Sequence, residues 1–344
     1  MQKVRANIHL KSIRENAVAF KRRVGVKLCA VVKANAYGHG AAEVALALGG
    51  VADCFAVALV EEGLSLRSAA LDKDILIFTP PTDEMQAYAI VSGGLVGSVS
   101  DLRTAKMFLR VCEKYRLSAR VHVKVNTGMN RYGMDISTLG KVCKLLKNSC
   151  VKVEGMYSHL YAPSCAEEQR KRFLQAQSVC RRYYTDLTYH LSATYGALLG
   201  KEYAFDMVRI GIGLYGYFPD GCRALANGLN LRKGMTVYAQ ALRNRVYKGG
   251  GVGYGEAAIA VGESFSLLRL GYADGFLRKR QNGVIGENIN ALCMDVCFQK
   301  GKKRVGGWVC VLDDAEWTAK QTGSIAYEIL CAATMRAEFV YEYD

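Results

Sequence analysis

A lysine at the end of an apolar segment is the first residue whose type and position could support chemistry. Lys33 follows the β-branched run Lys27–Val32 and precedes a segment of small residues and glycines, Ala34–Gly40. A lysine that emerges from an apolar strand is partly desolvated, which lowers its pKa and suits its amine to form an imine with an aldehyde. A solvated strand end would explain the same position, so by position alone Lys33 is only a candidate.

Further polar side chains occur at the ends of later apolar runs. Arg131, His159 and Arg209 each follow or close a β-branched segment. A salt bridge within a loop would also explain Arg131, and a lone histidine such as His159 is more often structural than catalytic. Tyr254 lies between glycines, where a turn residue and an acid/base residue fit the sequence equally well. These side chains form a site only if the fold brings them together.

Eight short apolar segments alternate with helical patterns between residues 27 and 210. Between them, apolar residues recur at three- and four-residue steps, most clearly after Ser100 and after Ser137. Eight strands that alternate with helices predict a parallel (β/α)8 barrel of the α/β class, whose active site lies at the carboxyl ends of its strands. The predicted strands are Lys27–Val32, Phe55–Ala58, Ile75–Phe78, Leu95–Val99, Arg120–Val125, Val151–Tyr157, Thr188–Leu191 and Met207–Ile210.

The sequence pattern changes after about Phe218. The later part contains β-rich segments with glycine turns, such as Thr236–Gly255 and Ser264–Gly271. We therefore expect two domains, a (β/α)8 barrel over residues 8–220 and a mostly β C-terminal domain over residues 221–344. The domain to which residues 1–7 belong is left open, because these residues could pair with the later strands rather than with the barrel.

Composition narrows the classes of protein. The 344-residue chain is 51% hydrophobic and 22% charged, so it can bury a large core. Its net charge of +15 includes short clusters such as Lys300–Arg304 without interleaved aromatics, which favours solvated basic faces over nucleic-acid binding. Met1–Arg23 lacks the apolar centre of a secretory signal, and Val44–Val60 falls short of a membrane helix. We expect a cytoplasmic protein without a membrane or nucleic-acid partner.

The cysteines do not indicate a disulfide framework. Twelve cysteines are scattered singly, often inside apolar segments, which predicts buried free thiols. Cys293 and Cys297 form the closest pair, but no second pair or nearby histidine completes a zinc set. We expect no metal.

The segment around Lys33 resembles the cofactor-lysine motif of alanine racemases almost letter for letter. It reads VVKANAYGHG from Val31 to Gly40. In that family the lysine holds pyridoxal phosphate as an internal imine, and the tyrosine four residues on contacts the phosphate. The resemblance implies that the chain uses pyridoxal 5'-phosphate, with Lys33 as cofactor lysine and catalytic base and with Tyr37 as a phosphate ligand.

A second match reads KVNTGMNRYG from Lys124 to Gly133 and resembles the family's lysine-aspartate-threonine-glycine-methionine-x-arginine segment. It implies that Arg131 bonds the phenolic oxygen of the cofactor and contacts the substrate. In many members the lysine that matches Lys124 is carbamylated and holds this arginine. The counterpart of His159 packs near the cofactor ring and hydrogen-bonds the arginine that binds the pyridine nitrogen.

That arginine corresponds to Arg209, in the segment DMVRIGIGLYG. Because a guanidinium keeps its protons, Arg209 would hydrogen-bond the ring nitrogen without protonating it. The ring is then a weaker electron sink, so carbanion character at the substrate α-carbon is stabilised only partly, which favours reprotonation over transamination or decarboxylation. Related barrel decarboxylases place an acidic residue here. The same resemblance assigns phosphate contacts to Thr194, Gly211, Ile212 and Tyr327.

Segments of the second domain also match the family. GVGYG, from Gly251 to Gly255, resembles the segment that bears the family's second acid/base, which implies that Tyr254 serves with Lys33 on opposite faces of a planar intermediate. In the family this tyrosine comes from the other subunit of a head-to-tail dimer, so the resemblance implies a homodimer with shared active sites. Tyr272 and Met294 would then line the partner's substrate site.

The sequence departs from the family pattern at three notable positions. Ala193 replaces the usual asparagine after the seventh strand, although Thr194 keeps a hydroxyl for the phosphate. Ala291 replaces an arginine that often precedes the cysteine-methionine-aspartate segment, and Asn126 replaces an aspartate. The implied catalytic residues remain, so we expect these departures to affect substrate selection and entry.

Together these residues predict a pyridoxal-phosphate-dependent racemase that interconverts L-alanine and D-alanine by a two-base mechanism. A racemase for serine or another small amino acid is an alternative, although the racemase domains of glycopeptide-resistance systems usually carry a membrane domain. A non-catalytic pyridoxal-phosphate-binding protein is an alternative of another class, but such single-barrel proteins lack the β-rich domain. Whether D-alanine would serve as a cell wall precursor or be degraded stays open.

Overall fold

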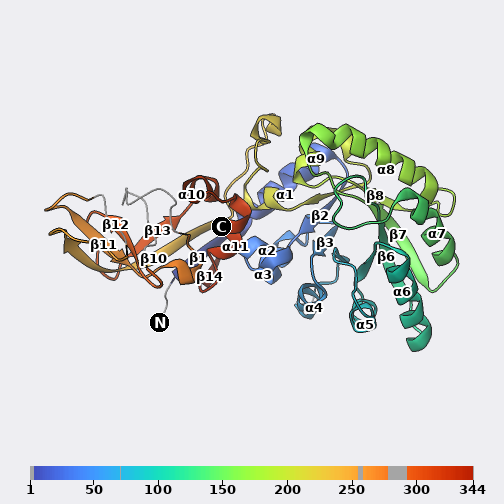
Figure 1. Ribbon diagram of the computed structural model, residues 1–344, viewed down its shortest axis with the longest axis horizontal. Coiled ribbons are helices and arrows are strands. Elements are labelled where there is room, and N and C mark those ends of the chain that lie inside the picture. Colours follow the sequence, from blue (N-terminus) through green and yellow to red (C-terminus); the bar gives the residue numbers. More distant parts are fainter. Residues whose placement is uncertain (1–3, 70, 255–258, 278–292, 344) are drawn as a thin grey trace.

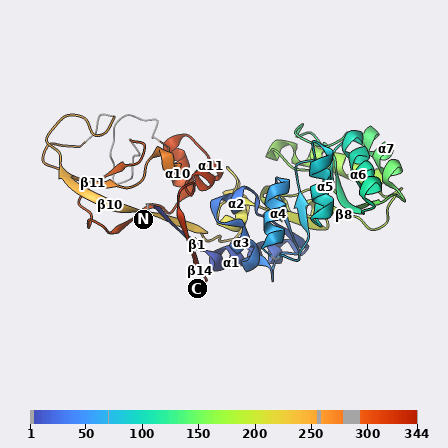
Figure 2. The same ribbon diagram turned by 90° about the horizontal axis from the view of Figure 1, so that it is seen from below.

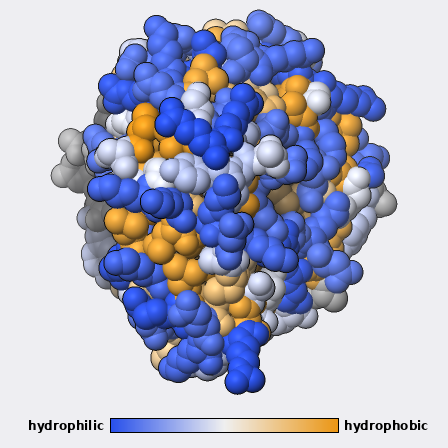
Figure 3. Space-filling model, turned by 90° about the vertical axis from the view of Figure 1, so that its right-hand side faces the viewer, coloured by the Kyte–Doolittle hydropathy of each residue, from blue (hydrophilic) through white to orange (hydrophobic). Residues whose placement is uncertain are grey.

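The structure is a computed structural model that describes residues 4–69, 71–254, 259–277 and 293–343. Two bodies lie end to end in an elongated molecule (Figure 1, Figure 2). One is a barrel of strands surrounded by helices, and the other is rich in strands. The end of the barrel that faces away from the β-rich body is mostly hydrophilic, with scattered apolar groups (Figure 3).

Eight parallel strands form the barrel in the order β8-β7-β6-β5-β4-β3-β2-β9. Each begins and ends within one residue of a strand predicted from the sequence, so the predicted (β/α)8 barrel is confirmed. Between β8 and β9, the ring is closed by a backbone hydrogen bond from Arg209 N to Ser192 O of 2.9 Å. The strands are β2 (Lys27–Val31), β3 (Cys54–Val57), β4 (Ile75–Ile77), β5 (Val96–Val99), β6 (Ala119–Lys124), β7 (Val151–Tyr157), β8 (Thr188–His190) and β9 (Met207–Ile210).

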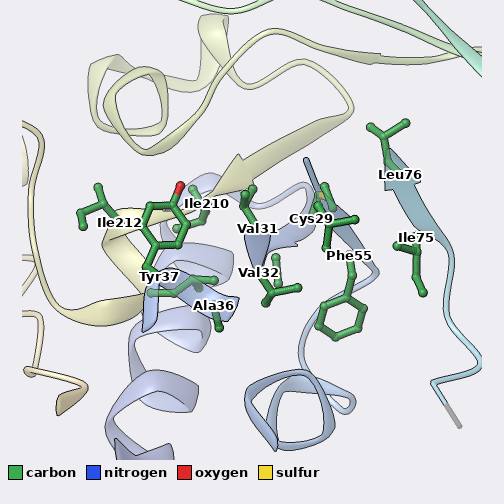
Figure 4. Close-up of a cluster of buried hydrophobic side chains, with 14 of the residues drawn as sticks. Cys29, Val31, Val32, Ala36, Tyr37, Phe55, Ile75, Leu76, Ile210 and Ile212 are labelled. Atoms are coloured by element: carbon green, nitrogen blue, oxygen red, sulfur yellow. The ribbon is translucent and has the colours of Figure 1, made fainter. Parts of the chain in front are cut away.

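The barrel strands are buried on both faces, which is why they read as nearly continuous apolar runs. β4, β5 and β9 are buried at every position. Figure 4 shows part of the resulting apolar cluster, with Cys29, Phe55, Leu76 and Ile210 from four strands. Full burial of one such large apolar side chain contributes about 1.5–3 kcal/mol, so this core holds the strand ends that carry the site in place.

Helices cover the outside of the barrel between successive strands (Figure 1). The helix predicted after Ser100 is confirmed as α6, where the carboxylate of Asp101 accepts the backbone N–H of Thr104 at 2.7 Å. The second helix was expected to follow Ser137, whereas α7 begins one residue earlier, at Ile136. The helices are α1 (Leu10–Val24), α2 (Lys33–Gly38), α3 (Ala41–Leu48), α4 (Val60–Ser68), α5 (Glu84–Ser92), α6 (Leu102–Tyr115), α7 (Ile136–Leu146), α8 (Ala166–Cys180) and α9 (Thr194–Leu199).

In the described residues, the second body consists of a six-stranded sheet and two α-helices. Its strands run in the order β12-β11-β10-β1-β14, and β13 pairs with β10. β1 is antiparallel to β10 and parallel to β14, so the start of the described chain lies in the same sheet as its end. The boundary between the barrel domain and the β-rich domain near residue 220 stays a prediction from the sequence. The elements are β1 (Val4–His9), β10 (Met235–Val246), β11 (Ser264–Leu268), β12 (Cys297–Lys300), β13 (Trp308–Leu312), β14 (Glu338–Glu342), α10 (Ala315–Thr322) and α11 (Ala326–Ala332).

All twelve cysteines carry free thiols. Six of them are buried, but Cys310 and Cys331 are exposed, so the expectation of burial is wrong for these two. None of the helices in the described ranges is long and apolar enough to cross a bilayer.

Candidate active site

A cavity of about 570 Å³ opens at the carboxyl ends of the barrel strands. This is the end of a (β/α)8 barrel at which active sites form, because the loops after the strands converge there. Most of the site residues predicted from the sequence line this one cavity. They are Lys33, Tyr37, Lys124, Arg131, His159, Thr194, Arg209, Gly211, Ile212 and Tyr327.

Lys33 begins α2 directly after β2 and is half-buried. Burial lowers the pKa of its amine, and the nearby positive charge of Arg131 lowers it further. The carboxylate of Glu62 opposes both effects. The net result is a larger fraction of neutral, nucleophilic amine near neutral pH than a solvated lysine would have.

The backbone after Lys33 is left-handed. Ala34–Tyr37 all have φ between 51° and 55°, although none is glycine. This conformation costs roughly 1–2 kcal/mol for each such residue, so the surrounding structure must enforce it. The side chain of His39 is buried, and its Nδ1 lies 3.0 Å from both Ala36 O and Tyr37 O, so it can hydrogen-bond the carbonyl groups of this turn. The turn carries Tyr37 into the wall of the cavity next to Lys33.

Tyr37 lies against the loop after β9. Its ring centroid is 4.9 Å from that of Tyr215 and 6.0 Å from that of Tyr327. A Cβ on Gly211 would lie 2.6 Å from Tyr37 Oη, so only glycine allows this approach. Gly211 N in turn donates to Thr194 Oγ1 at 3.3 Å. Hydroxyl and amide groups therefore converge at this end of the cavity, as a bound phosphate requires.

Arg209 is buried, and five acceptors surround its terminal nitrogens. Nη1 lies 2.9 Å from both His190 Nδ1 and His190 O, and Nη2 donates to Ser158 O at 2.6 Å and Leu191 O at 3.0 Å. Nη2 is also 3.4 Å from His159 Nδ1, the contact that the resemblance implied. Within the described ranges, Nε has no hydrogen-bond partner. Because Arg209 lines the cavity, this N–H is available to a ring nitrogen.

Burial lowers the pKa of Arg209 to about 10, and the guanidinium is still charged at neutral pH. Burial also holds the pKa of His159 and of His190 well below the usual value, and the charge of Arg209 adds to the effect. Both imidazoles are thus neutral beside a permanent cation. Arg209 can donate a hydrogen bond here without giving up a proton.

Three residues of this network, His122, Tyr157 and His190, were not predicted as site residues from the sequence. His190 Nε2 lies 2.8 Å from His122 Nδ1, which extends the contacts of Arg209 into the barrel interior. The ring of Tyr157 stacks on His190 with centroids 5.0 Å apart. A signal existed for two of them, because His190 lies next to the last residue of the predicted strand Thr188–Leu191 and Tyr157 ends the predicted strand Val151–Tyr157, so both lie at the carboxyl ends of barrel strands.

Lys124 is 4% exposed, and its Nζ lies 4.8 Å from the ring centroid of Tyr157. Burial lowers the pKa of its amine to about 7, with further contributions from Arg209, Arg131 and Lys33. A lysine in this state is close to half neutral at physiological pH.

Asn126 orders the loop that carries Arg131. Its Oδ1 accepts the backbone N–H groups of Gly128 at 3.0 Å and Asn130 at 3.1 Å. Its Nδ2 donates to Asn130 Oδ1 at 2.8 Å. An aspartate could accept the first two hydrogen bonds but could not donate the third. Asn126, which stands where the family usually has an aspartate, therefore stabilises the turn of this loop.

The cavity is strongly positive. Lys33, Lys124, Arg131 and Arg209 line it, and Asp220 is the one carboxylate among its described lining residues. Such a set fits an anionic ligand that carries a carbonyl for the amine and a ring nitrogen for Arg209.

Three predicted residues lie elsewhere. Tyr254, Tyr272 and Met294 belong to the β-rich body, are 79%, 39% and 52% exposed, and do not line the cavity of their own chain. Ala291 lies outside the described residues.

A lysine amine that shares a cavity with a buried arginine at the carboxyl ends of a (β/α)8 barrel, together with converging hydroxyl and amide groups, is typical of barrel enzymes of the pyridoxal-phosphate class. The sequence matches the family models "Alanine racemase, N-terminal domain" over residues 8–219 and "Alanine racemase, C-terminal domain" over residues 235–341. The chain belongs to the alanine racemase family, whose members are pyridoxal-phosphate-dependent enzymes.

Relatives and solved structures resemble the chain over nearly its full length. It is 32% identical to the alanine racemase of Lactobacillus delbrueckii subsp. bulgaricus, with 98% of this chain and 97% of that protein covered. Identity to alanine racemase 2 of Caldanaerobacter subterraneus subsp. tengcongensis is also 32%, over 98% and 95%. The alanine racemase of Clostridium difficile 630 superposes with a TM-score of 0.90 at 27% identity, over 99% and 96%.

Proposed function

We propose that this protein interconverts L-alanine and D-alanine, with pyridoxal 5'-phosphate held on Lys33. The observation that carries the proposal is the shared cavity of the Lys33 amine and the Arg209 guanidinium. Relatives across the whole chain bear the name alanine racemase, which supports alanine as substrate. A cytoplasmic location stays a prediction from the sequence.

When bound, pyridoxal phosphate supplies an electron sink that acidifies the α-hydrogen of an amino acid. Arg209 would donate its Nε–H to the ring nitrogen and, because it keeps its proton, limit the strength of that sink. Arg131 would bind the phenolic oxygen and the substrate carboxylate, and His159 would support Arg209. The phosphate would be held by Tyr37, Thr194, Gly211, Ile212 and Tyr327.

Racemisation requires a proton to leave one face of the α-carbon and another to arrive on the opposite face. Lys33 would exchange the proton on one face. Tyr254, the residue expected to act on the other face, is exposed on the β-rich body and does not line the cavity of its own chain. We propose a homodimer in which Tyr254, Tyr272 and Met294 of one copy complete the site of the other.

We expect alanine to have the highest kcat/KM among small amino acids. Enclosure of the α-substituent by Tyr254, Tyr272 and Met294 of a second copy would accept a methyl group, whereas a bulkier side chain would displace packed groups at a cost of about 1–3 kcal/mol. Serine adds only a hydroxyl, so discrimination against it should be at most about 100-fold. Progress curves from each enantiomer of alanine, serine, lysine and arginine measure this order. A higher kcat/KM for serine, lysine or arginine would contradict alanine while leaving the racemase activity intact.

We also expect Lys124 to carry a carbamate. Its neutral amine would attack carbon dioxide, forming an N–C bond and releasing one proton. Only the neutral form reacts, and burial lowers the pKa to about 7, so the carbamylated fraction should rise as the pH rises through about 7. The product would place a negative charge among the cations of the cavity.

The carbamate can be observed by carbon NMR of the protein in labelled bicarbonate, recorded at pH values on both sides of that pKa. The Lys124→Met variant is the control, because it lacks the amine but keeps a side chain of similar length. A carbamate signal that persists in Lys124→Met, or one that does not grow with pH, would refute this assignment.

A further inference from the structure

Glu62 joins two loops at the mouth of the barrel. This residue lies in the first turn of α4, and its side chain reaches back over the carboxyl ends of β2 and β3. Oε1 accepts the backbone N–H of Ala34 at 2.6 Å, and Oε2 accepts those of Ala58 at 2.8 Å and Leu59 at 3.0 Å. One carboxylate thus binds the loop after Lys33 to the loop after the neighbouring strand.

Hydrogen bonds hold the main chain on both sides of Lys33, from the sheet on the preceding side and from Glu62 on the following side. On the preceding side, Val32 N donates to Ala56 O of β3 at 2.9 Å, which continues the ladder between β2 and β3. On the following side, Ala34 N donates to Glu62. Ala34 is also the first residue of the left-handed turn, with φ of 51°. Without the carboxylate, this strained residue would lose the hydrogen bond of its N–H and could relax.

The charge of Glu62 also acts on Lys33. It raises the pKa of the Lys33 amine, against burial and the charge of Arg131. The neighbouring Glu61 carries the same charge but is exposed, and in the described part of the chain its side chain has no hydrogen bond or ion pair. The groups that interact electrostatically with Lys33 are Arg131, Glu62, Cys331, Lys124 and His159.

We propose that Glu62 is a positioning residue of this active site, which fixes the backbone of Lys33 through Ala34 and keeps a counter-charge beside its amine. The inference rests on the proposed role of Lys33. It predicts that Glu62 contributes to the rate of the chemical step rather than to substrate affinity, because its carboxylate is bonded to backbone N–H groups.

Glu62→Gln tests the proposal with little change of shape. The amide can still accept from one loop, but its NH2 group must then face a backbone N–H of the other. We expect kcat for alanine to fall about 10- to 100-fold in both directions, because small displacements of a catalytic group cost this much. KM should change by less than about threefold. Glu61→Gln, which removes the same charge one residue away, should keep wild-type kinetics.

A second measurement does not depend on turnover. Full-length protein freed of cofactor is mixed with pyridoxal phosphate, and the rate of absorbance change is recorded against pH. The midpoint of this profile should move down by roughly one pH unit in Glu62→Gln, since loss of a nearby negative charge lowers the pKa of a lysine, and should not move in Glu61→Gln. Glu62→Asp keeps the charge but shortens the reach, so it should lower kcat and leave the midpoint in place.

The proposal fails if Glu62→Gln matches the wild type in kcat and midpoint, or if Glu61→Gln changes both equally. If Glu62→Gln unfolds below the assay temperature, as judged by circular dichroism, Glu62→Asp decides: wild-type kcat in that variant would overturn the proposal. A wild-type protein that binds no cofactor at Lys33 would instead refute the proposed function.

Discussion

Replacement of Lys33 by alanine should abolish racemisation and detach the cofactor from the chain. Lys33 is the only predicted acid/base that lines the cavity of its own barrel together with Arg209. Loss of one positioned acid/base alone costs about 10²–10⁴ in rate, and loss of the covalent attachment of the cofactor adds to this. We expect kcat to fall at least about 10⁴-fold.

The measurement combines kinetics with borohydride reduction. In the wild type, reduction should fix the cofactor to the peptide that contains Lys33, and mass spectrometry of the digest should locate it there. In Lys33→Ala the reducible absorption band should disappear. Lys27→Ala is a matched control, because this exposed lysine lies at the opposite end of the same strand, β2. A reducible band that survives in Lys33→Ala would exclude Lys33 as the cofactor lysine.

Replacement of Tyr254 by phenylalanine should also remove most of the activity, although this residue lies outside the cavity of its own chain. Its side chain is 79% exposed, so the loss of its hydroxyl should leave the folded subunit intact. Without the second acid/base, turnover in both directions should fall about 10²–10⁴-fold. Tyr88→Phe, at another exposed tyrosine on the outside of the barrel, should have no effect.

Mixed dimers test whether the site is shared. In a hybrid of Lys33→Ala and Tyr254→Phe subunits, one barrel keeps Lys33 and receives Tyr254 from its neighbour, whereas the other has neither group. Random exchange makes half of the dimers hybrid, so about a quarter of the wild-type activity should return from two inactive proteins. If subunit exchange is verified by mass spectrometry of the mixture and activity does not return, the two residues do not act in a common site across subunits.

The strands of the barrel could be predicted from the sequence because their signal is local. A strand buried on both faces needs a short β-branched run, as in Ile75–Ile77 or Met207–Ile210, whatever its neighbours are. The position of Lys33 followed in the same way, since a residue after a barrel strand lies at the carboxyl end of the barrel. The motif resemblance then supplied the roles of Tyr37, Arg131 and Arg209.

The tertiary structure decided the features that depend on residues far apart in the chain. β1 joins the sheet of β10 and β14, and no local pattern in Val4–His9 selects these partners. The contacts of Arg209 with His190 and of Glu62 with Ala34 depend on how strands and helices pack side by side. Strand periodicity sets which face a side chain takes, but packing sets its partner, so the charge environment of Lys33 could be read only from the folded chain.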